Sequence, residues 1–288
     1  MRRYRELGFL KENIPERDPR PVWITMREDE RLLYDRIEEY ISDFYQRYEA
    51  ERRGLGFVMT VYRRRLTSSF AAIERSLRRR LDFLEGKAAP AFGLTDEDKE
   101  EEELDLDLDE ELEVVDRALF EAEIEYIYDF LDDLQALSGD SKWDRFRGEL
   151  QELLARRDSA VVFTQYTDTM DDLRTKLAAV YGSEVACYSG RGGEVFDGGE
   201  WRLTSKEEVK NAFRERQIKI LLCTEAASEG LNLQTCGVLI NYDMPWNPMR
   251  VEQRIGRIDR LGQKHQVMRV VNLHYKGTVE TDVYIALR

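Results

Sequence analysis

In the first half of the chain, apolar positions recur at three- and four-residue steps, the spacing of one face of an amphipathic helix. Runs of this kind predict helices over residues 32–48, 58–84, 112–137 and 143–156. The Arg-Gly-Leu-Gly segment at 53–56 predicts a break between the first two helices. Residues 86–112 combine Pro90, two glycines and a long acidic run, so we expect a partly disordered loop there.

The pattern changes at Ser159, after which short apolar runs alternate with helical ones. Strands are predicted at 160–163, 185–188, 218–223, 238–242 and 268–274, and helices at 167–181, 206–216 and 249–260. Either Thr167 or Asp168 is expected to cap the first of these helices. Strands that are apolar on both faces and separated by helices are typical of a parallel sheet covered on both sides.

The sequence therefore predicts two parts. Residues 1–157 form a mainly α-helical region, and residues 158–288 form an α/β domain with a parallel sheet flanked by helices. Residues 279–288 begin another helical pattern, so we expect this domain to be truncated at its C-terminus.

Charge is distributed unevenly along the chain, whose formal net charge is −14. Residues 96–116 hold 14 acidic residues and one basic residue, whereas residues 52–87 hold ten basic and three acidic residues. Such segregation indicates either contact with a polyanion or two solvated stretches that screen one another. Charge alone leaves both interpretations open.

Cysteine usage and hydropathy exclude two classes of protein. The cysteines, Cys187, Cys223 and Cys236, lack the paired spacing of a metal site and lie in or beside apolar runs, which is typical of reduced, buried thiols. No apolar stretch approaches the ~20 residues that cross a bilayer, and no apolar segment follows the basic N-terminus. We therefore expect a cytoplasmic protein.

Small and polar residues follow the predicted strands, where open parallel sheets bind their ligands. Gln165 follows the first strand, Ser189 and Gly190 follow the second, and the segment 224–234 follows the third. Hydroxyl groups and free backbone N–H groups at such positions suit phosphate contacts. Each of them, taken singly, also fits an ordinary turn.

The predicted helix over 249–260 carries a more specific pattern. Gln253, Arg257 and Arg260 follow one another at steps of four and three, so they share one helix face. The planar guanidinium group matches phosphate oxygens bidentately. Arginines at this spacing are also common on protein surfaces, so spacing by itself does not decide the function.

Four segments in order carry a resemblance to a known family. They are Val-Phe-Thr-Gln-Tyr at 162–166, the segment 224–234, Pro-Trp-Asn-Pro at 245–248 and the segment 253–263, which contains Arg-Leu-Gly-Gln. Together they resemble the second RecA-like lobe, or helicase C-terminal domain, of Swi/Snf-type superfamily-two DNA-dependent ATPases. The resemblance is to the bacterial and archaeal type, which includes the RNA-polymerase-associated ATPase, and it covers residues 158–278. A weaker likeness at 14–34 is to the connector that follows the first lobe in this family.

The resemblance implies roles for individual residues. Arg257 and Arg260 would be arginine fingers that reach the γ-phosphate of ATP, with Gln253 beside them and with Glu229 and Gly230 in the loop that links nucleotide state to DNA grip. Thr224, Ser189, Gly190 and Gln165 would hold the phosphate backbone of one DNA strand. The implied partners are double-stranded DNA, a first RecA-like lobe and RNA polymerase or another nucleoprotein, and the implied location is the nucleoid.

The sequence departs from the family in two respects. A phosphate-binding loop is missing, because the one Gly-Lys pair, Gly86-Lys87, is followed by Ala88. We therefore expect ATP and Mg to be bound mainly by the missing first lobe, and we expect this polypeptide alone not to hydrolyse ATP. The Gly-rich stretch at 191–201 is interpreted as a flexible surface loop, which puts the DNA contacts near Ser189 in doubt.

Two other functions stay open at this stage. One is an RNA-directed helicase of the same superfamily, which usually carries His where Gln253 stands. The other is a module that docks onto RNA polymerase or another partner without a motor role of its own. The basic helices at 52–87 would be a helical insertion that rests against DNA or against the other lobe.

Overall fold

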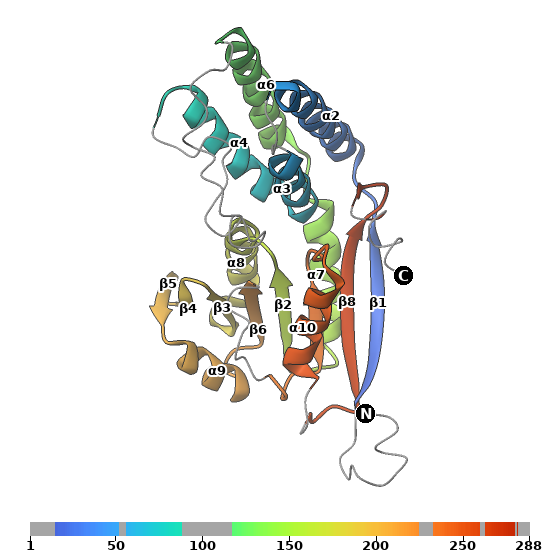
Figure 1. Cartoon of the computed structure of the whole chain (residues 1–288). Coiled ribbons are helices and arrows are strands. Elements are labelled where there is room, and N and C mark those ends of the chain that lie inside the picture. Colours follow the sequence, from blue (N-terminus) through green and yellow to red (C-terminus); the bar gives the residue numbers. More distant parts are fainter. Residues whose placement is uncertain are drawn as a thin grey trace. The chain divides into compact units, whose positions relative to one another are not determined.

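The computed structural model describes residues 15–51, 56–87, 117–224, 233–259, 263–279 and 281. Contacts between Cα atoms divide the chain into two units. The sheet unit consists of the segment up to Ile24 and the chain from Lys142 onward, and the helical unit runs from Thr25 to Ser141. This division differs from the boundary predicted at residues 157 and 158, because a strand and a helix that flank the helical unit belong with the sheet (Figure 1).

The sheet unit is built on one eight-stranded sheet with the order β1-β8-β7-β2-β6-β3-β4-β5. The strands are β1 (Glu16–Ile24), β2 (Ala160–Thr164), β3 (Val185–Ser189), β4 (Gly192–Asp197), β5 (Glu200–Thr204), β6 (Ile220–Thr224), β7 (Val238–Asn241) and β8 (Val267–Tyr275). Neighbours pair in parallel from β1 to β3 in this order, and the β3–β4 and β4–β5 pairs are antiparallel. Every residue of β2, β3, β6 and β7 is buried, which confirms the predicted α/β fold.

Helices cover both faces of this sheet. They are α7 (Ser141–Leu154), α8 (Thr167–Tyr181), α9 (Lys206–Arg214) and α10 (Pro248–Ile258). Alternate residues of β8 show that α10 and α7 lie on opposite faces, since successive side chains of a strand point to opposite sides. Met268 and Val270 share a core cluster with residues of α10, whereas Arg269 and Val271 face α7 (Figure 1).

The helix starts depend on local capping groups. The side chain of Asn247 accepts a hydrogen bond from the N–H of Met249 (2.9 Å), and Pro248 occupies the first turn of α10. The expectation that Thr167 or Asp168 caps α8 is wrong. The cap position is Tyr166, whose side chain makes no capping bond, and the helix already begins at Thr167.

β1 is an edge strand where the sequence predicted only a connector. It pairs in parallel with β8 from Glu16 opposite Val267 to Ile24 opposite Tyr275. Pro19 and Pro21 hide this strand from pattern reasoning, because proline weakens any strand assignment but is tolerated at a sheet edge.

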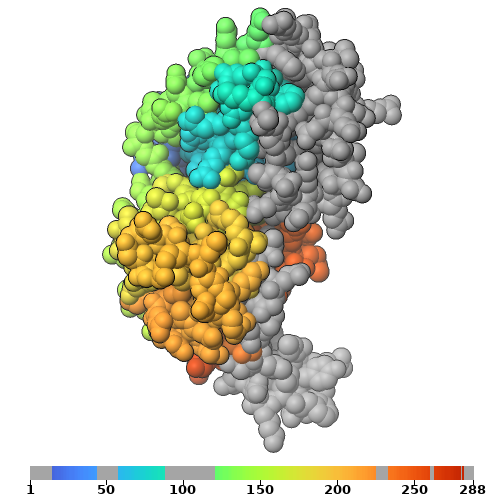
Figure 2. All heavy atoms as spheres, turned by 90° about the vertical axis from the view of Figure 1, so that its left-hand side faces the viewer, coloured from blue at the N-terminus to red at the C-terminus, as the bar shows by residue number. Residues whose placement is uncertain are grey.

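The Gly-rich stretch at 191–201 is ordered, so the expectation of a flexible surface loop is wrong. β4 and β5 form a hairpin, with Gly198 (φ +61°) and Gly199 (φ +91°) in its two-residue turn. Gly193 lies so close to α9 that a Cβ there would be 2.7 Å from Val209. The hairpin and α9 therefore pack together, and both contribute to the gold and orange surface in Figure 2.

The helical unit contains α2 (Glu28–Glu51), α3 (Gly56–Ser68), α4 (Phe70–Leu84) and α6 (Arg117–Ala136). The single helix predicted over 58–84 is wrong, since the chain breaks at Ser69. This residue has extended backbone angles, and its hydroxyl accepts a hydrogen bond from the N–H of Ala72 (3.0 Å), so it caps α4. The predicted loop at 86–112 lies almost wholly outside the described residues.

Several arginines of the basic stretch are engaged inside the helical unit. Arg80 is buried and donates to both carboxylate oxygens of Glu123, at 2.8 Å each, and the hydroxyl of Tyr40 donates to Glu123 as well (2.8 Å). Arg63 donates to Glu38 (2.5 Å), and Arg65 is buried. The positive charge of these helices is therefore not all available to an outside polyanion.

Among the described residues, none of the helices combines the length and the apolar character that a membrane span requires.

The Arg80–Glu123 pair predicts a large stability effect. Replacing Glu123 by Ala leaves a buried guanidinium group unpaired, so we expect a loss of about 3–5 kcal/mol in the free energy of unfolding. Glu74→Ala removes the partner of the half-exposed Arg78 and should cost less than ~1 kcal/mol. Urea unfolding followed by far-UV circular dichroism measures both. Similar losses in the two variants would show that burial of the pair does not matter.

The three cysteines are buried thiols, and burial raises the pKa of each above its usual value. Because the thiolate is the reactive form, we expect no labelling of the native chain by a thiol reagent at pH 8. Three labels should be incorporated in denaturant. Rapid labelling of any cysteine in the native chain, read by intact mass, would count against the packing described here.

Candidate functional site

A buried polar network lies at the carboxyl ends of β2 and β7 and extends to Asn272 of β8. Asp243 lies two residues after the end of β7, and its carboxylate accepts hydrogen bonds from the hydroxyl of Thr164 (2.5 Å) and from the backbone N–H of Gln165 (2.8 Å). At the end of β7, the side-chain amide of Asn241 donates to the amide oxygen of Asn272 (2.8 Å), its register partner on β8. The strand ends are thus joined by side chains as well as by the sheet ladder.

Arg254 of α10 connects the helix to this network. Its Nη1 donates to the side-chain oxygen of Asn241 (3.0 Å) and to the carbonyl oxygen of Asp243 (2.9 Å), and its Nη2 lies 3.8 Å from the Asp243 carboxylate. The guanidinium group also lies over the ring of Phe163, 5.5 Å from its centroid. Since Arg254 is wholly buried, these contacts fix the rotation of α10 about its axis.

The fixed rotation separates α10 into an inner and an outer face. Arg254, Ile255 and Ile258 are buried, whereas Gln253 is exposed and Arg257 is partly exposed. The helix covers both Gln253 and Arg257, four residues apart, so the predicted shared face is confirmed for these two. Arg260 lies outside the described residues.

The outer face of α10 has free space beside Gly256 and carries the Nε atom of Arg257, which has no hydrogen-bond partner among the described residues. A Cβ added at Gly256 would meet no described atom within 4 Å. Nε of Arg257 is shielded from solvent and has no hydrogen-bond partner in the described part of the chain. The Nε of Arg254 has no hydrogen-bond partner among the described atoms either, but Arg254 is wholly buried and its Nη1 donates within the unit, whereas Arg257 is partly exposed.

Gln263 holds the chain just beyond α10. Its side-chain amide donates to the carbonyl oxygens of Ile258 (2.7 Å) and Cys236 (3.0 Å), and its Oε1 accepts from the N–H of His265 (3.0 Å). A Cβ at Gly237 would lie 2.6 Å from the His265 ring, so only glycine leaves room for this approach. These contacts fix the chain on both sides of residues 260–262.

The predicted DNA-binding residues meet at one end of the sheet. Thr224 ends β6, Ser189 ends β3 and Gln165 follows β2, and these strands are neighbours in the order β2-β6-β3. Gly190 is exposed, whereas the side chains of the other three are buried, and the Thr224 hydroxyl has no hydrogen-bond partner among the described atoms. Glu229 and Gly230 lie outside the described residues.

Sequence reasoning missed the residues that build the network. The sequence analysis did not single out Arg254 beside Gln253 and Arg257. It lies on the same helix face as Ile255 and Ile258, which are buried. Asp243 carried a signal, since it is the first acidic residue after a buried strand.

The network predicts opposite outcomes for two neighbouring arginines. Arg254→Met leaves the buried carboxylate of Asp243 without its cation, so we expect a loss of about 3–5 kcal/mol in the free energy of unfolding. Arg257→Met makes the same change on the outer face and should cost less than ~1 kcal/mol. Tryptophan fluorescence during urea unfolding reports on the sheet unit, which contains all four tryptophans. Equal losses would exclude Arg254 as the interior anchor.

Comparison with known proteins gives a family match and several similar sequences. Residues 142–262 match the helicase conserved C-terminal domain. The uncharacterized ATP-dependent helicase YqhH of Bacillus subtilis (strain 168) is 42% identical over 126 residues, which are 44% of this chain and 20% of that protein. The RNA polymerase-associated protein RapA of Pseudomonas putida (strain W619) is 31% identical over 145 residues, which are 48% of this chain and 14% of that protein. The chain thus spans a fifth or less of the length of these relatives.

Two solved structures share the fold. The C-terminal part of the Fun30 ATPase domain matches with a TM-score of 0.59 at 14% identity, covering 95% of this chain and 89% of that one. The SWI2/SNF2 ATPase core of Sulfolobus solfataricus in complex with dsDNA matches with a TM-score of 0.55 at 16% identity, covering 95% of this chain and 44% of that one. Residues 142–262 are therefore similar to a helicase conserved C-terminal domain, and the chain shares the RecA-like fold of the Fun30 and SWI2/SNF2 ATPase structures.

Proposed function

We propose that this chain is the C-terminal motor lobe of an ATP-dependent DNA translocase of Swi/Snf type. In this proposal Arg257 and Arg260 reach the γ-phosphate of an ATP molecule held mainly by a first RecA-like lobe. The observation that carries the proposal is the outer face of α10. Arg254 on the inner side is wholly buried and donates through Nη1 to Asn241 and Asp243, whereas the side chain of Arg257, beside the exposed Gln253, makes no hydrogen bond to the described part of the chain.

The chemistry of this face suits a nucleotide phosphate. A guanidinium group offers N–H donors in a planar fork, which matches the oxygens of a phosphate and stabilises the charge that develops during phosphoryl transfer. The open space beside Gly256 allows another body to approach the helix closely. Gln263 supports the proposal indirectly, because it holds the chain that follows Arg260.

ATP and Mg are assigned mainly to the first lobe. The described residues contain no group of three or more His, Cys, Asp or Glu side chains placed to hold a metal ion. The residues of this chain that fit ATP are the donors of α10, which would complete a pocket whose phosphate loop belongs to the other lobe. For this reason the chain alone is not expected to hydrolyse ATP.

DNA contact is proposed at the carboxyl ends of β2, β6 and β3. The unpartnered hydroxyl of Thr224, together with Ser189, Gly190 and Gln165, would hold phosphate groups of one strand. Such contacts carry no sequence information, as a motor that moves along any DNA requires. The SWI2/SNF2 core that shares this fold was solved in complex with dsDNA, which supports duplex DNA as the substrate.

A second candidate is a lobe that docks onto RNA polymerase. The observation that favours it is the similarity to RapA, an RNA polymerase-associated protein. The two candidates differ in what Arg257 does, because a docking module has no use for a guanidinium group directed at a nucleotide.

The test uses the full-length protein that contains this chain. Arg257→Ala should lower the DNA-stimulated kcat for ATP hydrolysis by about 10³-fold or more, the range known for arginine fingers. Duplex DNA binding should be retained. The control is Arg214→Ala on α9, whose exposed guanidinium group contacts only Asn211 among the described residues and should leave kcat unchanged.

Several outcomes separate the candidates. Unchanged ATP turnover in Arg257→Ala with normal polymerase binding would favour the docking module, and stimulation by RNA rather than by duplex DNA would favour an RNA-directed helicase. ATP turnover above ~1 s⁻¹ by the 288-residue chain alone, the low end for ordinary enzymes, would contradict the assignment of the phosphate loop to another lobe.

A further inference from the structure

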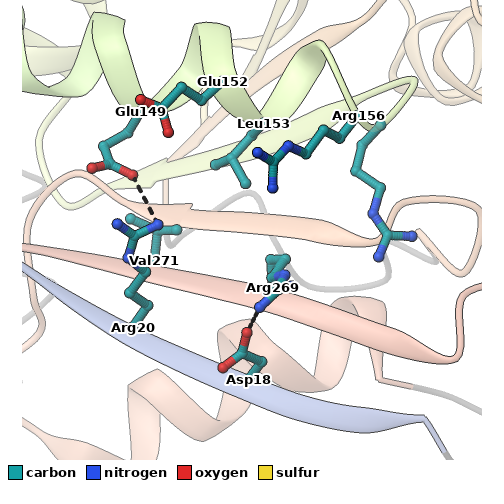
Figure 3. Close-up of a pocket in the computed structure, with 9 residues that line it drawn as sticks. Asp18, Arg20, Glu149, Glu152, Leu153, Arg156, Arg269 and Val271 are labelled. Atoms are coloured by element: carbon teal, nitrogen blue, oxygen red, sulfur yellow. Dashed lines mark ion pairs between the residues drawn. The ribbon is translucent and has the colours of Figure 1, made fainter.

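A polar cavity lies in the sheet unit, on the face opposite α10. It has a volume of about 320 Å³ and lies between α7 and the edge strands β1 and β8. Figure 3 shows Asp18 and Arg20 of β1 and Arg269 of β8 on one side of it, with Glu149 of α7 and Arg156 on the other. The carboxyl ends of the parallel strands and the outer face of α10 contribute nothing to this cavity.

The strand alternation explains how these side chains gather. Residues 18 and 20 share one face of β1, and Asp18 lies opposite Arg269 in the parallel register. Arg17 points to the other face, where it donates to Glu252 (2.8 Å) within α10 and to Asp259 (2.6 Å), the residue that follows this helix. The pairing of β1 with β8 therefore fixes the positions of the side chains on this wall of the cavity.

Among the four lining arginines, Arg269 has a carboxylate of its own, whereas Arg20 shares one with Arg145 and keeps part of its positive charge. Arg269 forms an ion pair with Asp18. Arg20 lies 3.7 Å from the carboxylate of Glu149, which also pairs with Arg145 (2.7 Å). The carboxylates of Asp18 and Glu149 are therefore both paired with arginines.

The other two arginines have no carboxylate partner among the described residues. Arg157 donates to Nδ1 of His265 (2.8 Å) and to the carbonyl oxygen of Val267 (3.3 Å), both of which are uncharged acceptors in this arrangement. The side chain of Arg156 has no partner in the described part of the chain, and Glu152 is the one lining carboxylate without an arginine. The cavity therefore has a net positive lining in a chain whose net charge is −14.

We propose that this cavity binds a phosphate-bearing small molecule, with its phosphate held by Arg156 and Arg20. Guanidinium forks on opposite walls can donate to separate oxygens of one phosphate group, and a phosphate is the ligand that best matches two such forks. The volume lies at the lower end for small-molecule sites and fits a ligand up to about the size of a mononucleotide. Leu153 and Val271 supply an apolar surface for the uncharged part of the ligand. The proposal does not depend on the motor function, since none of these residues belongs to α10.

The test is a calorimetric titration of the 288-residue chain with inorganic pyrophosphate at 150 mM NaCl, where weak surface attraction is screened. We expect saturable binding that Arg156→Ala and Arg20→Ala each weaken by about tenfold or more, equivalent to ~1.4 kcal/mol. The matched control is Arg202→Ala, an exposed arginine of β5 paired with Asp197, which should bind pyrophosphate within about twofold of the unaltered chain.

One further variant separates this cavity from the proposed nucleotide face. Arg257→Ala should bind pyrophosphate as the unaltered chain does. Loss of binding in Arg257→Ala but not in Arg156→Ala would place the anion on α10 and overturn the proposal. Absence of saturable binding to the unaltered chain, or equal affinities in the unaltered chain, Arg156→Ala and Arg20→Ala, would overturn it as well.

Discussion

A buried guanidinium group determines how α10 presents its functional residues. Burying the guanidinium group of Arg254 costs several kcal/mol unless its N–H groups form hydrogen bonds. Asn241 at the end of β7 and Asp243 just after it supply the acceptors. A rotation of the helix by one residue, about 100°, would separate Arg254 from these acceptors. The outward position of Gln253 and Arg257 is therefore a consequence of what Arg254 requires.

Pattern reasoning predicted most of the sheet unit, because its strands are apolar on both faces and its helices are periodic. It failed where a local signal and the tertiary context disagree. Pro19 and Pro21 mark a non-strand segment by propensity, yet β1 occupies an edge where their missing N–H groups cost little. The glycines of the β4–β5 hairpin suggested flexibility, whereas positive φ angles and close contact with α9 are the reasons for them. The candidate face of α10 was predicted from spacing, but spacing could not show that Arg254 is the interior residue.

Charge in this chain is used largely for internal organisation. The basic stretch predicted a surface for a polyanion, but Arg80 and Arg63 are paired with carboxylates that come from other helices of the same unit. Composition cannot distinguish an arginine that faces solvent from one that faces Glu123, because the partner lies far away in the sequence. The few arginines without a carboxylate, among the described residues, are therefore more informative than the total.

The pairing of β1 with β8 has a consequence for the order of folding. Residue 16 is the register partner of residue 267, so the edge of the sheet closes only after nearly all of the intervening chain has been synthesised. Contacts of such long sequence separation pay a large loop-closure entropy and form slowly. The helical unit, whose residues all lie between positions 25 and 141, can fold before the partner strand of β1 has been synthesised. Until then, the backbone N–H and C=O groups of β1 can pair with another exposed strand, so the incomplete chain is exposed to aggregation.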